Sequence, residues 1–249
     1  MKTVLSWSGG KDSTAMLIRA LELGYKIDDI IYIDIRFNEN TGGELPEMYE
    51  YIDRVEKYIG RKVTRIKSEW TYESHFYRQK KKGKFVGQIY GFPFIAIGNG
   101  WCNDRLKLKP VRDYKRSIGE HIMYVGIAAD EPKRLAKMNN NERSLLAEWG
   151  WTEQDCLQYL KEKGLENLLY RKFKRTGCWF CPKQNKKSLE IVYRDYPELW
   201  QMLLDMEKDS PVMFKPNTTL KELTEEFESK NKQISFLEGE INRWKKKQR

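Results

Sequence analysis

Short apolar runs alternate with amphipathic segments over roughly the first half of the chain. The apolar, β-branched runs predict buried strands at residues 4–5, 29–37, 63–66 and 121–128. Apolar residues at helical spacing predict helices at residues 15–23 and 46–58. Strands that alternate with helices in this way predict an α/β fold with a doubly wound, mostly parallel sheet.

Beyond about residue 140 the pattern becomes helical. Thr152 and the acidic residues after it resemble a helix start, and Gly164 ends that predicted helix. Further helices are expected at 188–208 and 220–249, with a proline-containing linker at 210–219 between them. The last helix carries an apolar stripe that docks either on the protein itself or on a partner helix, so a homo-oligomer is left open.

Basic residues exceed acidic ones by ten, 46 against 36, over 249 residues. Part of this excess is clustered, at residues 78–84, 171–175 and 243–249. Aromatic residues flank the first cluster, and such patches bind a phosphate backbone and stack unpaired bases. The sequence therefore predicts nucleic acid as a partner, with a solvated basic surface as the alternative.

No stretch approaches the length of about twenty apolar residues that a membrane-spanning helix needs, so no membrane partner is expected. The first residues lead directly into the motif described next, which leaves no room for a signal peptide. Together with the four cysteines, this predicts a cytoplasmic protein whose thiols serve metal or redox chemistry rather than structural disulfides.

The segment at residues 6–14 reads Ser-Trp-Ser-Gly-Gly-Lys-Asp-Ser-Thr and joins the first predicted strand to the first predicted helix. Its two glycines allow a tight turn with exposed amides. These amides, the serine hydroxyls and a helix N-terminus are suited to an anion, to which Lys11 adds a positive charge. The segment thus predicts a phosphate-binding loop made by Ser6, Ser8, Gly9, Gly10, Lys11, Asp12, Ser13 and Thr14.

This loop lacks the earlier glycine of the GxxxxGKS/T motif. It resembles instead the SGGKDS signature of the PP-loop ATP pyrophosphatase superfamily. That resemblance implies ATP and Mg²⁺ as ligands, because members split ATP between its α- and β-phosphates and hand AMP to a substrate oxygen, or bind a related adenylyl nucleotide. Lys11 and Asp12 are candidate catalytic residues; Asp12 either holds Mg²⁺ or caps the helix.

Other segments resemble the phosphoadenosine phosphosulfate (PAPS) reductase family within this superfamily. Residues 40–47 are similar to its DTG…PE stretch, and Asp34 before them is placed to meet the nucleotide. Residues 126–134 resemble its GxRxxES..R element. Arg134 there is a candidate for steadying the pyrophosphate leaving group, whose growing charge needs fixed cations. The alternatives are a surface charge, or a role for Lys107, Lys133, Arg105 or Arg112.

Two cysteine segments add to the resemblance. Residues 101–110 resemble the CC..RK..P segment of the iron–sulfur adenylylsulfate reductases, with Trp101 replacing one cysteine, and residues 177–182 resemble the family's CxxC. Cys102, Cys178 and Cys181 are therefore candidate metal ligands. The resemblance favours a 4Fe–4S cluster whose open iron carries the sulfur to be transferred. Zinc, a redox dithiol and reduced buried thiols are the alternatives, and Cys156 is expected in the core.

The chain has no cysteine after Cys181, whereas PAPS reductases carry a nucleophilic cysteine near their C-terminus. The resemblance therefore favours relatives that activate a substrate with ATP and insert sulfur, of the DNA phosphorothioation or tRNA thiolation type. It implies DNA or tRNA as substrate and a cysteine desulfurase or other protein as sulfur donor. An adenylyl-sulfate or PAPS reductase and a non-catalytic nucleotide- or nucleic-acid-binding module are the rival predictions.

These predictions divide the chain into three parts. Residues 1–140 form the expected nucleotide-binding α/β domain, residues 141–209 a helical region with the CxxC, and residues 210–249 the linker and C-terminal helix.

Overall fold

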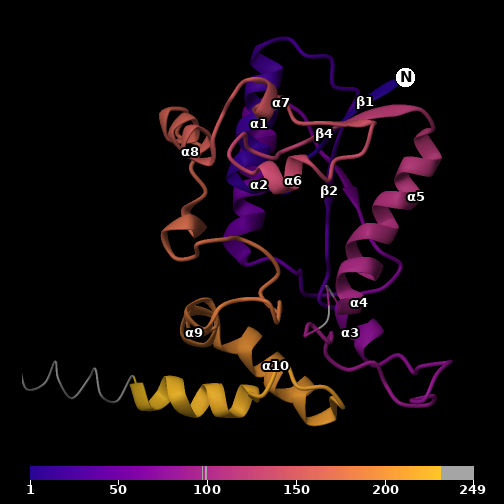
Figure 1. The fold of residues 1–249 in the computed structure, drawn as a ribbon. Helices are drawn as coiled ribbons and strands as arrows, with labels where there is room; N and C mark the ends of the chain where they lie inside the picture. The colour runs from indigo at the N-terminus through magenta and orange to yellow at the C-terminus, as the bar shows by residue number, and fades with distance from the viewer. Residues whose placement is uncertain (97, 99, 231–249) are drawn as a thin grey trace, which may run out of the picture. The chain divides into compact units, whose positions relative to one another are not determined.

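The computed structural model describes residues 1–96, 98 and 100–230 (Figure 1). The chain divides into two compact units. The first, called the sheet unit here, contains Met1–Ser74 and Trp101–Trp179, and the second, the helical unit, contains His75–Gly100 and Phe180–Arg249. This division differs from the expected boundaries at 140 and 209. The helices at 145–148 and 153–162 belong to the sheet unit and pack on the helix at 11–22, while residues 75–100 belong to the same unit as the C-terminal helices.

Five parallel strands in the order β3-β2-β1-β4-β5 form the core of the sheet unit. They are β1 (Lys2–Ser6), β2 (Asp29–Ile33), β3 (Thr64–Ile66), β4 (His121–Val125) and β5 (Glu142–Arg143). In the central strand β1, Val4 lies opposite Asp29 of β2 on one side and Met123 of β4 on the other. The predicted parallel α/β sheet is confirmed.

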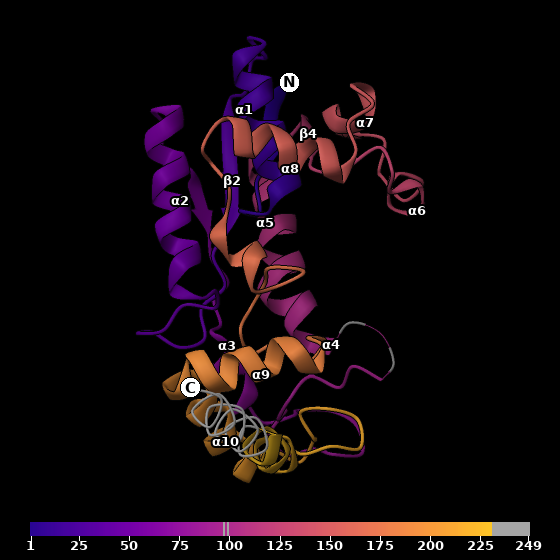
Figure 2. The same cartoon turned by 90° about the vertical axis from the view of Figure 1, so that its left-hand side faces the viewer.

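Helices cover both faces of this sheet. In Figures 1 and 2, α1 (Lys11–Glu22) and α2 (Pro46–Ile59) lie on one face and α5 (Lys109–Ile118) lies on the other. Tyr114 and Ile118 of α5 pack against the buried side chains of Val4, Ile31 and Met123. Successive residues of a strand point to opposite faces, so both faces of the central strands are buried, as their apolar sequences require.

Shorter elements connect these layers. They are α3 (Tyr72–Phe76), α4 (Gly100–Cys102), a π-helical turn (Asn103–Leu108), α6 (Pro132–Leu135), α7 (Leu145–Glu148), α8 (Glu153–Glu162) and a 3₁₀ turn (Leu168–Arg171). The predicted start of α8 is confirmed, because Thr152 and Asp155 form a reciprocal capping box. Tyr159 of α8 donates to Glu22 of α1 at 2.6 Å, which joins α8 to the sheet unit.

Several predicted elements have different ends; the strand expected at 121–128, for example, ends at Val125. The strand expected at 29–37 ends at Ile33. The apolar pattern continues because Ile35 and Phe37 are buried in the following loop, where the Phe37 amide donates to Thr41 at 2.9 Å. The helix expected at 188–208 is two helices, α9 (Lys186–Asp195) and α10 (Pro197–Asp209), because proline cannot donate the backbone hydrogen bond that a continuous helix needs.

In the helical unit, residues 220–230 are helical and bury Leu220, Leu223 and Phe227. The Phe227 ring lies 5.9 Å from that of Trp200 in α10. The first part of the expected apolar stripe therefore docks on its own chain. The remainder of that predicted helix, 231–249, lies outside the described residues, and self-association stays a prediction. None of the helices in the described ranges is long and apolar enough to cross a membrane.

Candidate nucleotide site

The loop between β1 and α1 is a glycine turn closed by serine hydroxyls. Gly9 has a φ of +72°, and a Cβ there would lie 3.0 Å from the sulfur of Met48, so both the conformation and the space favour glycine. The Ser8 and Ser13 hydroxyls lie 3.0 Å apart, and the Ser8 amide donates to the Ser13 hydroxyl at 3.2 Å. These bonds fold the loop back over the first turn of α1.

Contacts on the core side also fix the first turn of α1. Thr14 is fully buried, donates to the Gly10 carbonyl at 2.8 Å and accepts from the Trp7 indole at 2.8 Å. Just after β4, Gly126 comes so close that a Cβ would lie 2.6 Å from Cα of Ser13. The N-terminus of α1 is thus fixed at the carboxyl ends of β1 and β4. Doubly wound sheets bind ligands at this place, where the strand order reverses.

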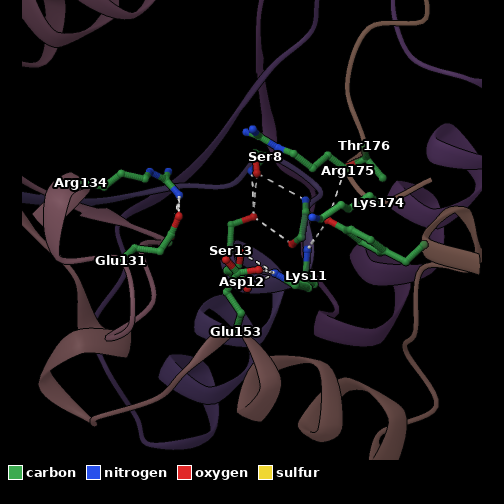
Figure 3. Close-up of a pocket in the computed structure, with 13 residues that line it drawn as sticks. Ser8, Lys11, Asp12, Ser13, Glu131, Arg134, Glu153, Lys174, Arg175 and Thr176 are labelled. Atoms are coloured by element: carbon green, nitrogen blue, oxygen red, sulfur yellow. Dashed lines mark hydrogen bonds and ion pairs between the residues drawn. The ribbon is translucent and has the colours of Figure 1, made fainter. Parts of the chain in front are cut away.

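A cavity of about 390 Å³ opens at this N-terminus (Figure 3). Its volume lies within the range of small-molecule sites. Four parts of the sheet unit line it: the loop and first turn of α1, the segment from Gly126 to Arg134, Glu153 at the start of α8, and residues 170–176. The cavity therefore combines a helix N-terminus with side chains from three distant parts of the sequence.

Among the paired charged side chains of this cavity, that of Lys11 is the least exposed, at 16%. Its ammonium donates to Asp12 at 2.9 Å and to Glu153, and Figure 3 shows the three side chains pointing toward one another. Burial lowers the pKa of Lys11, but the hydrogen bonds with Glu153 and Asp12 outweigh it, so the pKa is raised and the group stays charged. The pKa of Asp12 is also raised, because the effect of burial outweighs the hydrogen bond and positive charge of Lys11, which lower it.

The cations of the cavity fall into two classes. Lys11 and Arg134 are paired with carboxylates, Arg134 through one nitrogen that lies 2.6 Å from each carboxylate oxygen of Glu131. Lys174 and Arg175 form no ion pair with any residue that the structure describes. In the described structure, carboxylates therefore neutralise the charges of Lys11 and Arg134, whereas the charges of Lys174 and Arg175 are available to an anion that enters the cavity.

The structure brings together some of the predicted nucleotide residues. Those that line the cavity are Ser8, Gly10, Lys11, Asp12, Ser13 and Arg134. Ser6, Gly9 and Thr14 are not in its lining; they end the strand, make the turn and support the helix. Asp34 is also outside the lining, at the end of β2, where its carboxylate lies 3.4 Å from the Lys67 ammonium. Its predicted contact with the nucleotide stays a prediction.

Sequence reasoning missed Glu153 and Tyr170 as site residues. The Tyr170 hydroxyl accepts a hydrogen bond from the Lys11 amide at 3.1 Å, across 159 residues of sequence. Glu153 stands out in the sequence only as part of an acidic first turn, which many helices have. The basic run at 171–175 is a signal of anion binding, but the sequence does not indicate that part of it faces this cavity.

A second titratable group lies on the loop after β2. Burial is the main cause that raises the pKa of Glu44 to about 7, the negative charge of Asp34 adds to it, and Lys107 opposes it. Burial also raises the pKa of Tyr49 to about 12, and its hydroxyl accepts from the Glu44 amide at 3.4 Å. Glu44 is therefore a carboxyl that titrates near neutrality inside the predicted DTG…PE stretch.

The CxxC segment begins against the same loop. The Trp179 amide donates to the Gly43 carbonyl at 3.0 Å, and its indole donates to the Gly42 carbonyl at 2.9 Å. A Cβ at Gly42 would lie 2.1 Å from the Tyr49 hydroxyl, and one at Gly43 would lie 2.5 Å from the Ile35 carbonyl oxygen, so the close packing of this loop requires both glycines. This contact places Cys178 in the sheet unit, beside the loop that carries Glu44.

The three candidate metal ligands are divided between the units. Cys102 and Cys178 belong to the sheet unit and Cys181 to the helical unit. Within the described ranges, no three His, Cys, Asp or Glu side chains are gathered so that they could hold a metal ion. Ligation of a metal or cluster by these cysteines therefore stays a prediction. Cys156 is fully buried, and burial raises its pKa to about 12, in agreement with the expected core position.

The doubly wound sheet and the serine- and glycine-containing loop between β1 and α1 have the arrangement of a PP-loop protein. The family model of the phosphoadenosine phosphosulfate reductase domain matches residues 2–184, so the chain belongs to this family. The resemblance that the motifs predicted is confirmed.

Three curated relatives match most of the chain. The uncharacterized protein MJ0066 of Methanocaldococcus jannaschii is 29% identical over 210 residues, which are 80% of this chain and 40% of that protein. The nin region protein ORF290 of Escherichia phage lambda is 25% identical over 90% of this chain and 80% of its own length. MJ0973 of the same archaeon is 25% identical over 82% of this chain and 47% of its own length. The chain thus spans less than half of both archaeal relatives.

Among solved structures, the U34-tRNA thiolase NcsA from Methanococcus maripaludis, determined with its 4Fe–4S cluster, covers 92% of this chain and 71% of its own. The TM-score is 0.44 and the sequence identity 14%. At this degree of likeness, nothing that NcsA binds is carried over to this chain.

Replacing Glu153 by Gln is expected to strengthen binding of pyrophosphate by up to about 5-fold. The change removes a carboxylate that holds Lys11 and repels an incoming anion. Calorimetric titration with pyrophosphate measures it, with Glu162→Gln at the far end of α8 as the matched control. Unchanged or weaker binding would contradict competition between Glu153 and the anion.

The raised pKa of Glu44 predicts a pH-dependent stability. The folded protein binds the proton of Glu44 more tightly than the unfolded chain does. The contribution of this proton to the free energy of unfolding is therefore complete below about pH 4.5 and is lost as the pH rises through about 7. Denaturant unfolding at about pH 5 and about pH 8 should show a loss of up to about 3 kcal/mol that Glu44→Gln abolishes. Glu50→Gln, on an exposed part of α2, is the control; an equal pH dependence in both variants would refute the assignment.

Proposed function

We propose that this protein binds ATP in the cavity at the N-terminus of α1 and adenylylates an oxygen of a nucleic-acid substrate for sulfur insertion. The observation that carries the proposal is the convergence of the α1 amides, the Ser8 and Ser13 hydroxyls and Lys11 on one cavity where the strand order reverses. DNA phosphorothioation and tRNA thiolation are the two reaction types that this chemistry serves.

In the proposed reaction the substrate oxygen attacks the α-phosphorus of ATP. The bond from that phosphorus to the oxygen bridging to the β-phosphate breaks, and pyrophosphate leaves with the bonding electrons. A sulfur nucleophile, supplied by a donor such as a cysteine desulfurase, then displaces AMP from the activated substrate. Asp12 is the loop residue that would hold Mg²⁺ beside the phosphates, because Mg²⁺ takes one or two carboxylates plus phosphate oxygens.

A nucleic-acid substrate is supported by a basic hairpin in the helical unit, residues 78–90. Its strands pair through an antiparallel bridge between Gln79 and Ile89, and the Lys80 amide donates to Gln88 at 2.8 Å. The ring of Phe85 is 51% exposed, with the ammonium groups of Lys80 and Lys84 at 5.4 and 5.9 Å.

The lysines of this hairpin form no ion pair in the part of the chain that the structure describes; they are Lys80, Lys81, Lys82 and Lys84. Unpaired cations around an exposed aromatic ring suit a single strand, whose phosphates take the charges while a base stacks on the ring. A reductase of adenylyl sulfate has less support, because no cysteine is among the described residues that line the cavity.

Turnover tests this function. Protein supplied with ATP, Mg²⁺, nucleic acid and a sulfur donor should release AMP and pyrophosphate, and Lys11→Ala should lower that rate by about 100-fold because it removes a fixed cation from the phosphates. Lys137→Ala, an exposed position outside the cavity, should leave the rate unchanged. Sulfite formed from adenylyl sulfate without ATP would support the reductase instead. ATP that is bound but left intact with every substrate would support a binding module.

Salt dependence tests the hairpin. Replacing Lys81, Lys82 and Lys84 together by Ala should reduce the slope of log affinity against log salt by about 0.7 for each lost single-strand phosphate contact. Phe85→Ala should weaken binding while leaving that slope unchanged, since stacking releases no counterions. Fluorescence anisotropy with a labelled single strand measures both effects. An equal change in a triple Ala variant at Lys26, Lys137 and Lys161 would show only a general charge effect.

A further inference from the structure

We propose that Lys174 and Arg175 bind the terminal phosphates of the nucleotide and the departing pyrophosphate, and so distinguish ATP from AMP. The inference rests on the proposed function in that it takes ATP as the ligand. It assigns the role that the sequence suggested for Arg134 to two residues on a different segment.

The pairing of the cavity's charges carries the inference. Four cations and three carboxylates line it. The carboxylates of Asp12 and Glu153 hold Lys11, and that of Glu131 holds Arg134. Lys174 and Arg175 are therefore the source of the cavity's net positive charge, and without them the lining is net negative. A polyphosphate carries several negative charges, so its strongest attraction is to the cations that have no carboxylate partner.

Arg134 lies in the family-like element at 126–134, but its ion pair makes it less suited than Lys174 and Arg175 to binding the terminal phosphates. A single nitrogen of its guanidinium lies 2.6 Å from both oxygens of Glu131, the residue just before α6. A phosphate at Arg134 must displace that carboxylate or share the guanidinium with it, and in either case the approaching anion meets a negative charge. Lys174 and Arg175 require no such exchange.

The segment that carries these two cations also contacts the phosphate loop directly. The Tyr170 hydroxyl accepts from the Lys11 amide at 3.1 Å and would lie 3.4 Å from a Cβ at Gly10. The Thr176 hydroxyl lies 3.5 Å from that of Tyr170. Tyr170 thus attaches this segment to the N-terminus of α1, Thr176 folds back to Tyr170, and Lys174 and Arg175 lie between these two residues in the lining of the cavity. A phosphate chain that starts at the α1 amides extends along this segment.

Calorimetric titration of the full chain with ATP, AMP and pyrophosphate tests the proposal. The double variant with Lys174→Ala and Arg175→Ala should bind ATP and pyrophosphate about 100-fold more weakly, about 10-fold for each cation, because charge-assisted hydrogen bonds to phosphate are lost. Its affinity for AMP should change by less than about 2-fold. Arg175→Lys should retain part of the affinity, since the charge remains without the planar fork.

Lys137→Ala and Lys161→Ala, both exposed and outside the cavity lining, control for the change in net charge. Arg134→Ala tests the competing assignment, and it should alter the ATP-to-AMP preference by less than about 3-fold. Lys174 and Arg175 are exposed, so thermal unfolding should show the double variant to be as stable as the wild type. The proposal is overturned if the double variant loses ATP and AMP affinity equally, or if Arg134→Ala alone removes the preference.

The outcome for the proposed function is separate. Wild-type protein that binds pyrophosphate and ATP through these two residues but never releases AMP would keep this inference and refute adenylylation. Wild-type protein that binds neither ATP nor pyrophosphate would refute both.

Discussion

The site depends on one constraint, the fixed position of the first turn of α1. Thr14 joins this turn to the Gly10 carbonyl and to the Trp7 indole inside the core, and Gly126 permits β4 to approach it without a Cβ in between. A helix N-terminus attracts anions only where its free amides point at the ligand, and the attraction falls off within one turn. The contacts of Thr14 and Gly126 therefore fix the direction of the free amides at the start of α1, which is what the proposed phosphate site requires.

The charges around this turn follow from that rigidity. With Lys11 partly buried beside the loop, its ammonium needs a partner when no anion is bound, and Asp12 and Glu153 supply it. Together with the pair of Arg134 and Glu131, these carboxylates leave this part of the cavity lining with a net negative charge. In the proposed site, attraction for a polyphosphate depends on the segment at 170–176, which is far from the loop in sequence but contacts it through Tyr170.

The sequence predicts the sheet, the loop and the family well, because each depends on local patterns. A β-branched run, a glycine pair at a strand-to-helix junction and a capping box are decided by neighbouring residues. The rest depends on contacts that no local pattern encodes. In the sequence, Glu153 is indistinguishable from an ordinary acidic residue at a helix start, and only the packing of α8 on α1 brings it to Lys11. Ile35 and Phe37 continue the apolar pattern of a strand, although they are buried in a loop. Arg134 has a family motif around it, yet only the structure shows its pairing with Glu131.

The most direct test of this account is amide hydrogen exchange of the full chain with and without pyrophosphate, resolved to the residues between Ser8 and Ser13. If the α1 N-terminus holds the phosphates, pyrophosphate should slow exchange at the amides of Gly10, Lys11, Asp12 and Ser13, and the effect should be weaker in Lys11→Ala. Exchange at these amides that is unaffected by pyrophosphate, with protection appearing only elsewhere in the chain, would contradict it.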